Sequence, residues 1–280
     1  MTPPLGGPEP LEIPPRHGHI KSFSVGVRNL RTFKWDPSFP HDMGRLPTWN
    51  PTEWKRAGWF YRGVYRTIRR PLVASIRLHG RGVENFPRTG PAIVASNHYT
   101  YADPVLLAAI TPRPYTFLAK SGLFKYRLSN WFFRSSNCLP VYRGKGEGNE
   151  ATLLASRGIL ERGGLVAIYP EATRAPPGEM LPGKTGAVRL ALETGAPIVP
   201  VACATDEFWP LKKTFPRLGR GAWYNIGKPI HLGKDLELAK DRDYCRKATD
   251  DLMTQIRALL TEAQAARDRR EKWNWSEQRR

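Results

Sequence analysis

The chain has 280 residues, enough for one α/β domain with a substantial core and additional segments at its ends. Lys and Arg number 44 against 25 acidic residues, and the formal net charge of +19 favours an anionic partner: lipid, nucleic acid or a phosphorylated small molecule. The nine Trp and ten Tyr favour lipid among these. Three widely spaced Cys without a Cys-x-x-Cys pair exclude a disulfide framework and a zinc site, and predict a reducing compartment.

The first part of the chain predicts an arm followed by a helix. Residues 1–52 are rich in Pro and Gly and show little periodicity, which predicts a partly ordered N-terminal arm. Residues 53–71 predict a basic amphipathic helix, because apolar side chains recur on one helical face and basic side chains on another. Two interpretations stay open: an interfacial membrane anchor, or a helix packed on the domain with a solvated basic face.

Residues 72–266 predict a single α/β domain, because short apolar runs alternate with helical segments. The predicted strands are 92–96, 116–119, 139–142, 165–169, 198–202 and 223–227, the last as an outer strand. The predicted helices are 104–110, 149–162, 186–194 and 243–267. This order favours a mostly parallel central sheet flanked by helices. Pro200 inside an apolar run favours an edge strand or a bulge. Residues 267–280 predict a charged, frayed tail.

The chain lacks an apolar run of the roughly 20 residues that a spanning helix needs. If it meets a membrane, we expect it to lie peripherally on the cytoplasmic face, without a transmembrane helix. The segment 123–133 is both aromatic and basic. It either borders a groove for an apolar chain or forms a helix buried against the sheet, and the sequence leaves both open.

The first motif with chemical potential is the turn after the strand 92–96. His98 stands where α/β folds expose reacting groups, at the carboxyl end of a buried strand. Asp103 follows five positions later, where its carboxylate can return to the imidazole and leave the other ring nitrogen as a proton acceptor. Such a pair can deprotonate an alcohol. The spacing alone is weak evidence, because Asp103-Pro104 is also a favourable helix start.

Three further segments carry charged residues directly after strands or before a helix. Arg143 follows the strand 139–142, and Glu171 with Arg174 follows the strand 165–169. Lys184 precedes a predicted helix, where an anion can bind. Guanidinium groups bind phosphate in a bidentate manner. Taken singly, each of these segments has an equally good structural explanation. Arg143 can be an ordinary surface cation, Glu171 and Arg174 can be a charge pair in a turn, and Lys184 can belong to a polar loop.

The motifs together, in this order, resemble the 1-acylglycerol-3-phosphate acyltransferase (PlsC-type) family of glycerolipid acyltransferases. That family is marked by Asn-His-x4-Asp, an Arg motif after a strand, a Phe-Pro-Glu-Gly-Thr-Arg block and a Val-Pro-Val-like strand. The resemblance covers residues 77–260 and includes Gly-Lys-Pro-Ile at 227–230. Tyr169 replaces the usual Phe, and Ala172 replaces the usual Gly. The Ala adds a methyl group where the backbone either passes close to the ligand or adopts a positive φ angle.

The resemblance implies an acyltransferase in which His98 is the general base and Asp103 orients and supports it. The donor would be a thioester, acyl-CoA or acyl carrier protein, without an acyl-enzyme. The acceptor would be a lysophosphatidic acid-type lipid at an anionic membrane surface, and the product phosphatidic acid. The family's mechanism needs neither a metal nor a cofactor.

The substrate-binding residues implied by the resemblance are Arg143, Glu171, Thr173, Arg174 and Lys184. The two Arg would hold the acceptor phosphate, with Lys184 as a weaker contributor, and Glu171 would bind the glycerol part. Another lysophospholipid, a glycolipid headgroup or glycerol 3-phosphate stays open as the acceptor. An inactive membrane-binding relative also stays open because of Ala172. A nucleic-acid partner is disfavoured because the cations are dispersed rather than set in a nucleic-acid motif.

Overall fold

The computed structural model describes residues 77–100, 102–141, 147–176, 179–206 and 221–273, and before them only Gly63 and Thr67, both helical. The predicted arm, residues 1–52, lies outside the described residues. So does the predicted helix 53–71 except for those two positions, where the Thr67 hydroxyl donates to the Gly63 carbonyl at 2.7 Å.

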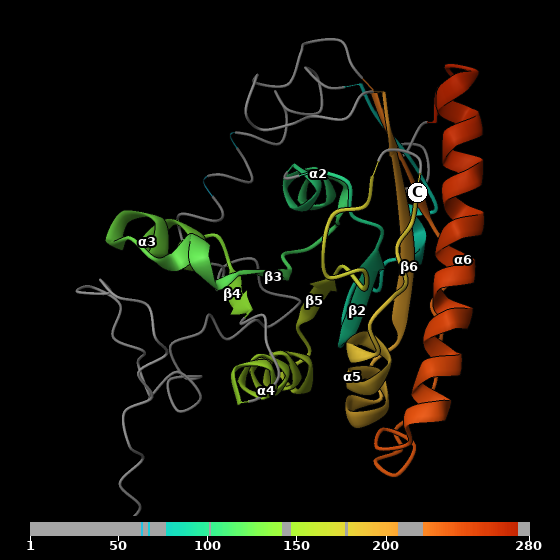
Figure 1. Cartoon of the computed structure of the whole chain (residues 1–280). Coiled ribbons are helices and arrows are strands. Elements are labelled where there is room, and N and C mark those ends of the chain that lie inside the picture. Colours follow the sequence, from blue (N-terminus) through green and yellow to red (C-terminus); the bar gives the residue numbers. More distant parts are fainter. Residues whose placement is uncertain are drawn as a thin grey trace, which may run out of the picture. The chain divides into compact units, whose positions relative to one another are not determined.

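A seven-stranded sheet forms the centre of the described part (Figure 1). In chain order its strands are β1 (Arg77–Arg81), β2 (Ala92–Ser96), β3 (Thr116–Lys120), β4 (Cys138–Val141), β5 (Leu165–Ile168), β6 (Ile198–Thr205) and β7 (Gly221–Ile226). Their spatial order is β1-β7-β6-β2-β5-β3-β4. Every neighbouring pair is parallel except β6 and β7. The prediction of a mostly parallel sheet is confirmed.

Helices cover both faces of this sheet. They are α2 (Asp103–Ile110), α3 (Arg127–Ser135), α4 (Glu147–Glu161), α5 (Gly186–Thr194) and α6 (Arg242–Asp268), with the 3-10 turns η3 (Val83–Asn85) and η4 (Ser121–Phe124). Residues of α2 share one apolar cluster with Ala92 and Val94, whereas residues of α4, α5 and α6 share another with Ile93 and Ala95. Figure 1 accordingly shows α2 on one side of the sheet and α5 and α6 on the other. Because β2 is buried on both faces, it reads as a continuous apolar run.

One expectation for the strands near this end of the sheet is wrong, and one strand was missed. Residues 221–226 form an inner strand, because β1 pairs with β7 and covers its outer side. Strand β1 itself was not predicted. Its sequence, Arg-Leu-His-Gly-Arg, lacks an apolar run, and its two terminal Arg are exposed.

Pro200 lies in a central strand, since β6 is placed between β2 and β7. The ladder to β7 begins one residue later, at Val201 opposite Ile226. The Pro200 carbonyl accepts from the Gly227 backbone at 2.9 Å, where the chain has already left the ladder. In a strand, the N–H and the C=O of one residue point to the same side. The Pro200 nitrogen, which has no hydrogen, therefore also faces Gly227, where β7 has ended and no N–H donor is required. Beyond this strand, Ile230 forms an isolated antiparallel bridge to Ile198.

The long helix α6 packs along β6 and β7 (Figure 1). Asp241 caps its start by accepting from the backbone N–H groups of Asp243 and Tyr244. The chain beyond it stays attached to the domain as far as Trp273. The Trp223 indole donates to the Glu271 carbonyl at 2.8 Å, and Trp273 is 8% exposed. The first part of the predicted frayed tail is thus packed, and residues 274–280 lie outside the described part.

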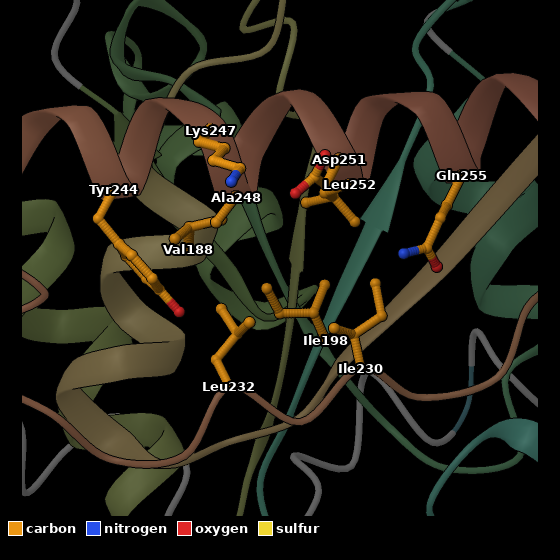
Figure 2. A pocket seen from close by; sticks show the side chains of 10 residues that line it. All are labelled: Val188, Ile198, Ile230, Leu232, Tyr244, Lys247, Ala248, Asp251, Leu252 and Gln255. Atoms are coloured by element: carbon orange, nitrogen blue, oxygen red, sulfur yellow. The ribbon is translucent and has the colours of Figure 1, made fainter.

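Among the described residues, none of the helices combines the length and the apolar character needed to cross a bilayer. A cavity of about 380 Å³ lies between α5, α6 and the segment around Ile230 (Figure 2). Its floor includes Ile198, the first residue of β6, which pairs with Ile93 near the start of β2. This cavity is therefore near the amino ends of the parallel strands.

Candidate active site

The candidate site forms at the carboxyl ends of two adjacent strands. β2 ends at Ser96 and leads to His98, and β5 ends at Ile168 and leads to Glu171. These strands are direct parallel neighbours, so their carboxyl ends meet at one edge of the sheet. The edge joins residues 73 positions apart: the His98 backbone N–H donates to Glu171 Oε1 at 3.0 Å.

His98 and Asp103 form the predicted pair. Asp103 Oδ2 lies 2.8 Å from His98 Nδ1, and Asp103 is 4% exposed. The same oxygen accepts from the backbone N–H groups of Tyr99 and Thr100 at 2.7 and 2.8 Å, and Oδ1 accepts from the Thr100 hydroxyl at 2.5 Å. A carboxylate held by this many donors keeps one orientation. The contact fixes the His98 proton on Nδ1 and leaves Nε2 as the proton acceptor. The His98 side chain is 19% exposed, so the ring stays partly accessible.

Helix geometry explains this arrangement. Asp103 is the first residue of α2, and Pro104 follows it at a position that needs no N–H partner. The carboxylate turns back to bond the N–H groups that precede the helix. One side chain thus stabilises the helix start and contacts the imidazole, and the catalytic role of the pair stays a prediction.

Glu171 has both carboxylate oxygens engaged by backbone. Oε1 accepts from the His98 N–H, and Oε2 accepts from the Leu181 N–H at 2.8 Å. Burial raises the pKa of Glu171, and the two backbone hydrogen bonds and the nearby His98 partly oppose this rise. Glu171 therefore fastens the turn that carries His98 to the loop that faces it. Each oxygen keeps a further lone pair, so glycerol binding by Glu171 stays a prediction.

The loop from Tyr169 to Lys184 lies against the His98 turn. The Ala175 N–H donates to the His98 carbonyl at 2.9 Å, and the Lys184 N–H donates to the Pro170 carbonyl at 2.7 Å. Ala172 has φ = 56°, which confirms the left-handed conformation expected where the family carries Gly. The loop thus brings Glu171, Thr173, Arg174 and Lys184 to the same edge as His98.

The side chains of these candidate residues differ in accessibility. Thr173 and Lys184 are exposed, and Arg174 is half-buried. The Lys184 backbone N–H donates to the Pro170 carbonyl, and Ala175, which follows Arg174, donates to the His98 carbonyl. Arg143 lies outside the described residues. The roles of Arg143, Thr173, Arg174 and Lys184 therefore stay predictions.

Tyr169 is a neighbour of His98 that sequence reasoning noted only as a substitution. Its ring stacks on the imidazole with centroids 4.2 Å apart and an interplanar angle of 23°. Its hydroxyl is buried and has no hydrogen-bond partner among the described residues. Burial raises the pKa of this phenol well above its ordinary value, so the group stays neutral. The stacking requires an aromatic ring and makes no use of the hydroxyl.

Asn97 is the residue whose role the sequence did not predict. It is 1% exposed, and its amide donates to the Cys203 carbonyl at 3.1 Å and accepts from the Cys203 N–H at 2.8 Å. Backbone pairing between β2 and β6 ends at Ser96 and Val201, although β6 continues to Thr205. The Asn97 side chain replaces the missing partner strand. In the sequence, the only indication that Asn97 has a role is its position next to His98.

Cysteine and metal chemistry find little support in the described part. Cys138, Cys203 and Cys245 are buried and free, and burial raises the pKa of each thiol. Within the ranges that the structure describes, three or more His, Cys, Asp or Glu side chains do not gather in an arrangement suited to a metal ion. The expected independence of metals and cofactors stays a prediction.

Comparison with known proteins agrees with this arrangement. Residues 77–204 match the model of the Acyltransferase family. The chain is 28% identical to a chloroplastic 1-acyl-sn-glycerol-3-phosphate acyltransferase of Brassica napus, over 50% of this chain and 43% of that protein. It is 25% identical to the enzyme of that name in Borreliella burgdorferi, over 60% of this chain and 68% of that protein. The human 1-acyl-sn-glycerol-3-phosphate acyltransferase beta is 30% identical, over 56% of this chain and 55% of that protein.

The chain spans about half the length of several of these relatives. A solved structure shares the fold: the 1-acyl-sn-glycerophosphate acyltransferase of Thermotoga maritima, with a TM-score of 0.54 and 22% identity, over 79% of this chain and 83% of that one. The matched segment contains the His98–Asp103 pair and the Glu171 turn. The chain is therefore similar over residues 77–204 to the Acyltransferase family, and in its sequence to the 1-acyl-sn-glycerol-3-phosphate acyltransferases.

Proposed function

We propose that the chain transfers a fatty acyl group from a thioester donor to the hydroxyl of a lysophosphatidic acid-type acceptor, giving phosphatidic acid. The observation that carries the proposal is the contact between His98 Nδ1 and Asp103 Oδ2 at the carboxyl edge of the sheet. The similarity to 1-acyl-sn-glycerol-3-phosphate acyltransferases supports this acceptor and this class of reaction. The donor is acyl-CoA or acyl carrier protein.

The geometry supports a direct transfer with His98 as general base. Nε2 takes the proton of the acceptor hydroxyl while its oxygen attacks the thioester carbonyl. The tetrahedral intermediate then expels the thiolate, which receives the proton from the imidazolium. Asp103 keeps the ring oriented and stabilises its transient positive charge. One ester forms, one thioester breaks, and one thiol leaves.

Residues near the pair support transfer without an acyl-enzyme. The Thr100 hydroxyl donates to Asp103, and the Ser96 hydroxyl donates to the Asn97 carbonyl at 3.2 Å. The Cys203 thiol is buried, and its raised pKa keeps it protonated. In the described part, these nearby nucleophilic groups are thus engaged or unreactive. The substrate hydroxyl remains as the nucleophile for His98.

We further propose how the acceptor is held. Arg174 and Arg143 would bind its phosphate, Lys184 would add a weaker positive charge, and Glu171 with Thr173 would contact the glycerol part. The net charge of +19 suits an anionic acceptor in an anionic membrane. The protein would work peripherally at the cytoplasmic face, without a metal, a cofactor or a nucleic-acid partner.

The test is identification of the product by mass spectrometry. Purified protein receives oleoyl-CoA, or the same acyl group on acyl carrier protein, with lysophosphatidic acid in mixed micelles. Parallel reactions contain lysophosphatidylcholine, a glycolipid or glycerol 3-phosphate as acceptor. The proposal expects phosphatidic acid to form fastest. Preferential acylation of another acceptor would replace the proposed acceptor while keeping the chemistry. A folded protein that acylates none of them would make it an inactive relative.

A further inference from the structure

An exposed apolar surface lies at the start of α3, which Figure 1 shows beside β3 and β4. Leu123, Tyr126 and Leu128 are 41%, 65% and 77% exposed. Lys125 and Arg127, both exposed, alternate with them along the chain. We call these five residues the α3 patch. The Lys125 ammonium lies 5.3 Å from the Tyr126 ring centroid, so cation and aromatic ring form one surface.

The patch is not needed to hold α3 on the domain. Phe124, 1% exposed, and Phe133 fix the inner side, with ring centroids 5.5 Å apart. Ser129 stabilises the start of the helix through hydrogen bonds with the Tyr126 backbone. The apolar patch side chains stay exposed while Phe124 and Phe133 make this packing. The expectation of a helix buried against the sheet is wrong for α3, in which none of the residues is buried.

The charged residues in the sequence around the patch have one sign. Between Asp103 and Glu147 the sequence contains no Asp or Glu. The same stretch contains Arg113, Lys120, Lys125, Arg127, Arg134, Arg143 and Lys145. An apolar, aromatic surface set in an unbroken basic stretch complements an anionic interface with an apolar interior. A second copy of the same chain would bring the same positive charge and be repelled.

The patch begins at the edge of the sheet that carries His98. β3 is parallel to β5, which is parallel to β2, so the three carboxyl ends share one edge. η4 follows the carboxyl end of β3 directly and leads into Tyr126 and Leu128. A flat anionic surface that contacts the patch would therefore lie toward the edge where the substrate must enter.

We propose that the α3 patch docks the protein on an anionic lipid bilayer, with Tyr126 and Leu128 inserted at the interface and Lys125 and Arg127 at the headgroups. This inference rests on the proposed function, which requires the protein to work on a lipid substrate. It adds which surface of the protein contacts the lipid. Docking there turns the His98 edge toward the bilayer and shortens the path of a lipid acceptor to the base.

The first test measures vesicle binding without any acyl donor, so that binding and catalysis are separated. The full chain and the double variant Tyr126→Ser with Leu128→Gln are sedimented with vesicles of phosphatidylcholine and phosphatidylglycerol. Loss of the two apolar side chains is expected to lower the partition coefficient about tenfold. Leu154→Gln is the matched control, because Leu154 is 52% exposed on α4, away from the patch, and should leave binding unchanged.

The second test addresses charge. Lys125→Gln with Arg127→Gln is expected to lower binding to the anionic vesicles about tenfold, and to have little effect with phosphatidylcholine alone. Arg242→Gln with Lys247→Gln removes the same charge from exposed positions of α6. This control should keep most of the binding, because screening limits distant charges.

The outcomes separate this inference from the proposed function. Equal partition coefficients for the native chain, the patch variants and the controls would overturn the patch as the docking surface. Patch-dependent self-association, or patch-dependent binding to duplex DNA instead of vesicles, would overturn lipid as the occupant. Patch-dependent vesicle binding without acyl transfer to any acceptor would keep the inference and reject the proposed function. Each variant is compared by its circular dichroism spectrum to confirm folding.

Discussion

At the scale of single residues, Glu171 is the side chain whose structural position differs most from its expected role. The resemblance assigns it to the acceptor, whereas the structure engages both of its oxygens with the backbone of His98 and Leu181. A residue that holds the base in place affects the rate even when it does not contact the substrate. Its substitution therefore tests positioning as well as binding.

Glu171→Gln replaces one accepting oxygen by an NH2 group that must face a backbone N–H. We expect a loss of about 1–3 kcal/mol in the free energy of unfolding at neutral pH, together with a lower rate of acyl transfer. Chemical denaturation and the thiol-release rate measure the two effects. An unchanged unfolding free energy would contradict the two backbone hydrogen bonds.

The raised pKa of Glu171 also determines how the difference in unfolding free energy between the native chain and Glu171→Gln depends on pH. The folded state binds the Glu171 proton more tightly than the unfolded state, because burial disfavours the carboxylate. The contribution of Glu171 to stability is therefore complete below its ordinary pKa of 4.5 and decreases as the pH rises through the folded value. The stability advantage of the native chain over Glu171→Gln should shrink over that window.

Ala172 is a second test at the residue scale. Its left-handed backbone is unfavourable for a residue with a Cβ atom. Ala172→Gly should raise the free energy of unfolding by up to about 1 kcal/mol, offset in part by the greater freedom of Gly in the unfolded chain. Thermal unfolding measures this change. A decrease in stability would show that the methyl group contributes packing that outweighs the strain.

At the scale of elements, the end of β2 determines where the base stands. Asn97 ties this end to β6 at Cys203 after the backbone ladder has stopped. Asn97→Ala leaves a buried N–H and a buried carbonyl without a partner, so we expect a loss of about 2–4 kcal/mol in unfolding free energy and a slower transfer reaction. Denaturation curves and initial rates are the measurements.

Asn85→Ala is the matched control for this prediction. The Asn85 amide makes one hydrogen bond, to the Ile226 carbonyl at 2.9 Å, and lies outside the candidate site. It should lower stability by a smaller amount and leave the rate unchanged. If both variants lower the rate equally after correction for the folded fraction, Asn97 has no specific part in placing His98.

The elements also show which parts of the fold the sequence could predict. β2 and α5 were predicted with their observed bounds, because an apolar run or a helical period is closed by a clear signal such as Gly195. β1 was missed, since its exposed ends and Gly80 resemble a loop until β7 covers it. The inner position of β7 depends on that same distant pairing. Local patterns carry no information about such partners.

The candidate site divides in the same way. The His98–Asp103 pair depends on residues five positions apart, and the sequence was sufficient to predict it. The Asn97 contact with Cys203 and the Glu171 contact with His98 join residues 106 and 73 positions apart. They follow from the order of the strands, which places β5 and β6 on either side of β2. Only the tertiary structure reveals these supports.

At the scale of the whole molecule, charge and chemistry point to the same kind of partner. A net charge of +19 attracts anionic surfaces at low ionic strength and is screened as salt is added. We expect transfer to lysophosphatidic acid in anionic vesicles to slow by about tenfold or more between low salt and about 0.5 M salt. The rate with the same acceptor in neutral detergent micelles should change much less. Equal salt dependence in both systems would contradict an electrostatic contribution from the lipid surface.

The central claim is that His98, oriented by Asp103, activates the acceptor hydroxyl for direct attack on the thioester. The most direct measurement is the rate of thiol release from oleoyl-CoA, or from the acylated carrier protein, with and without lysophosphatidic acid. It is made for the native chain, His98→Ala and the exposed control His231→Ala. The account predicts acceptor-dependent release that falls about 10²–10⁴-fold in His98→Ala and stays unchanged in His231→Ala. Equal release by a folded His98→Ala variant would contradict it.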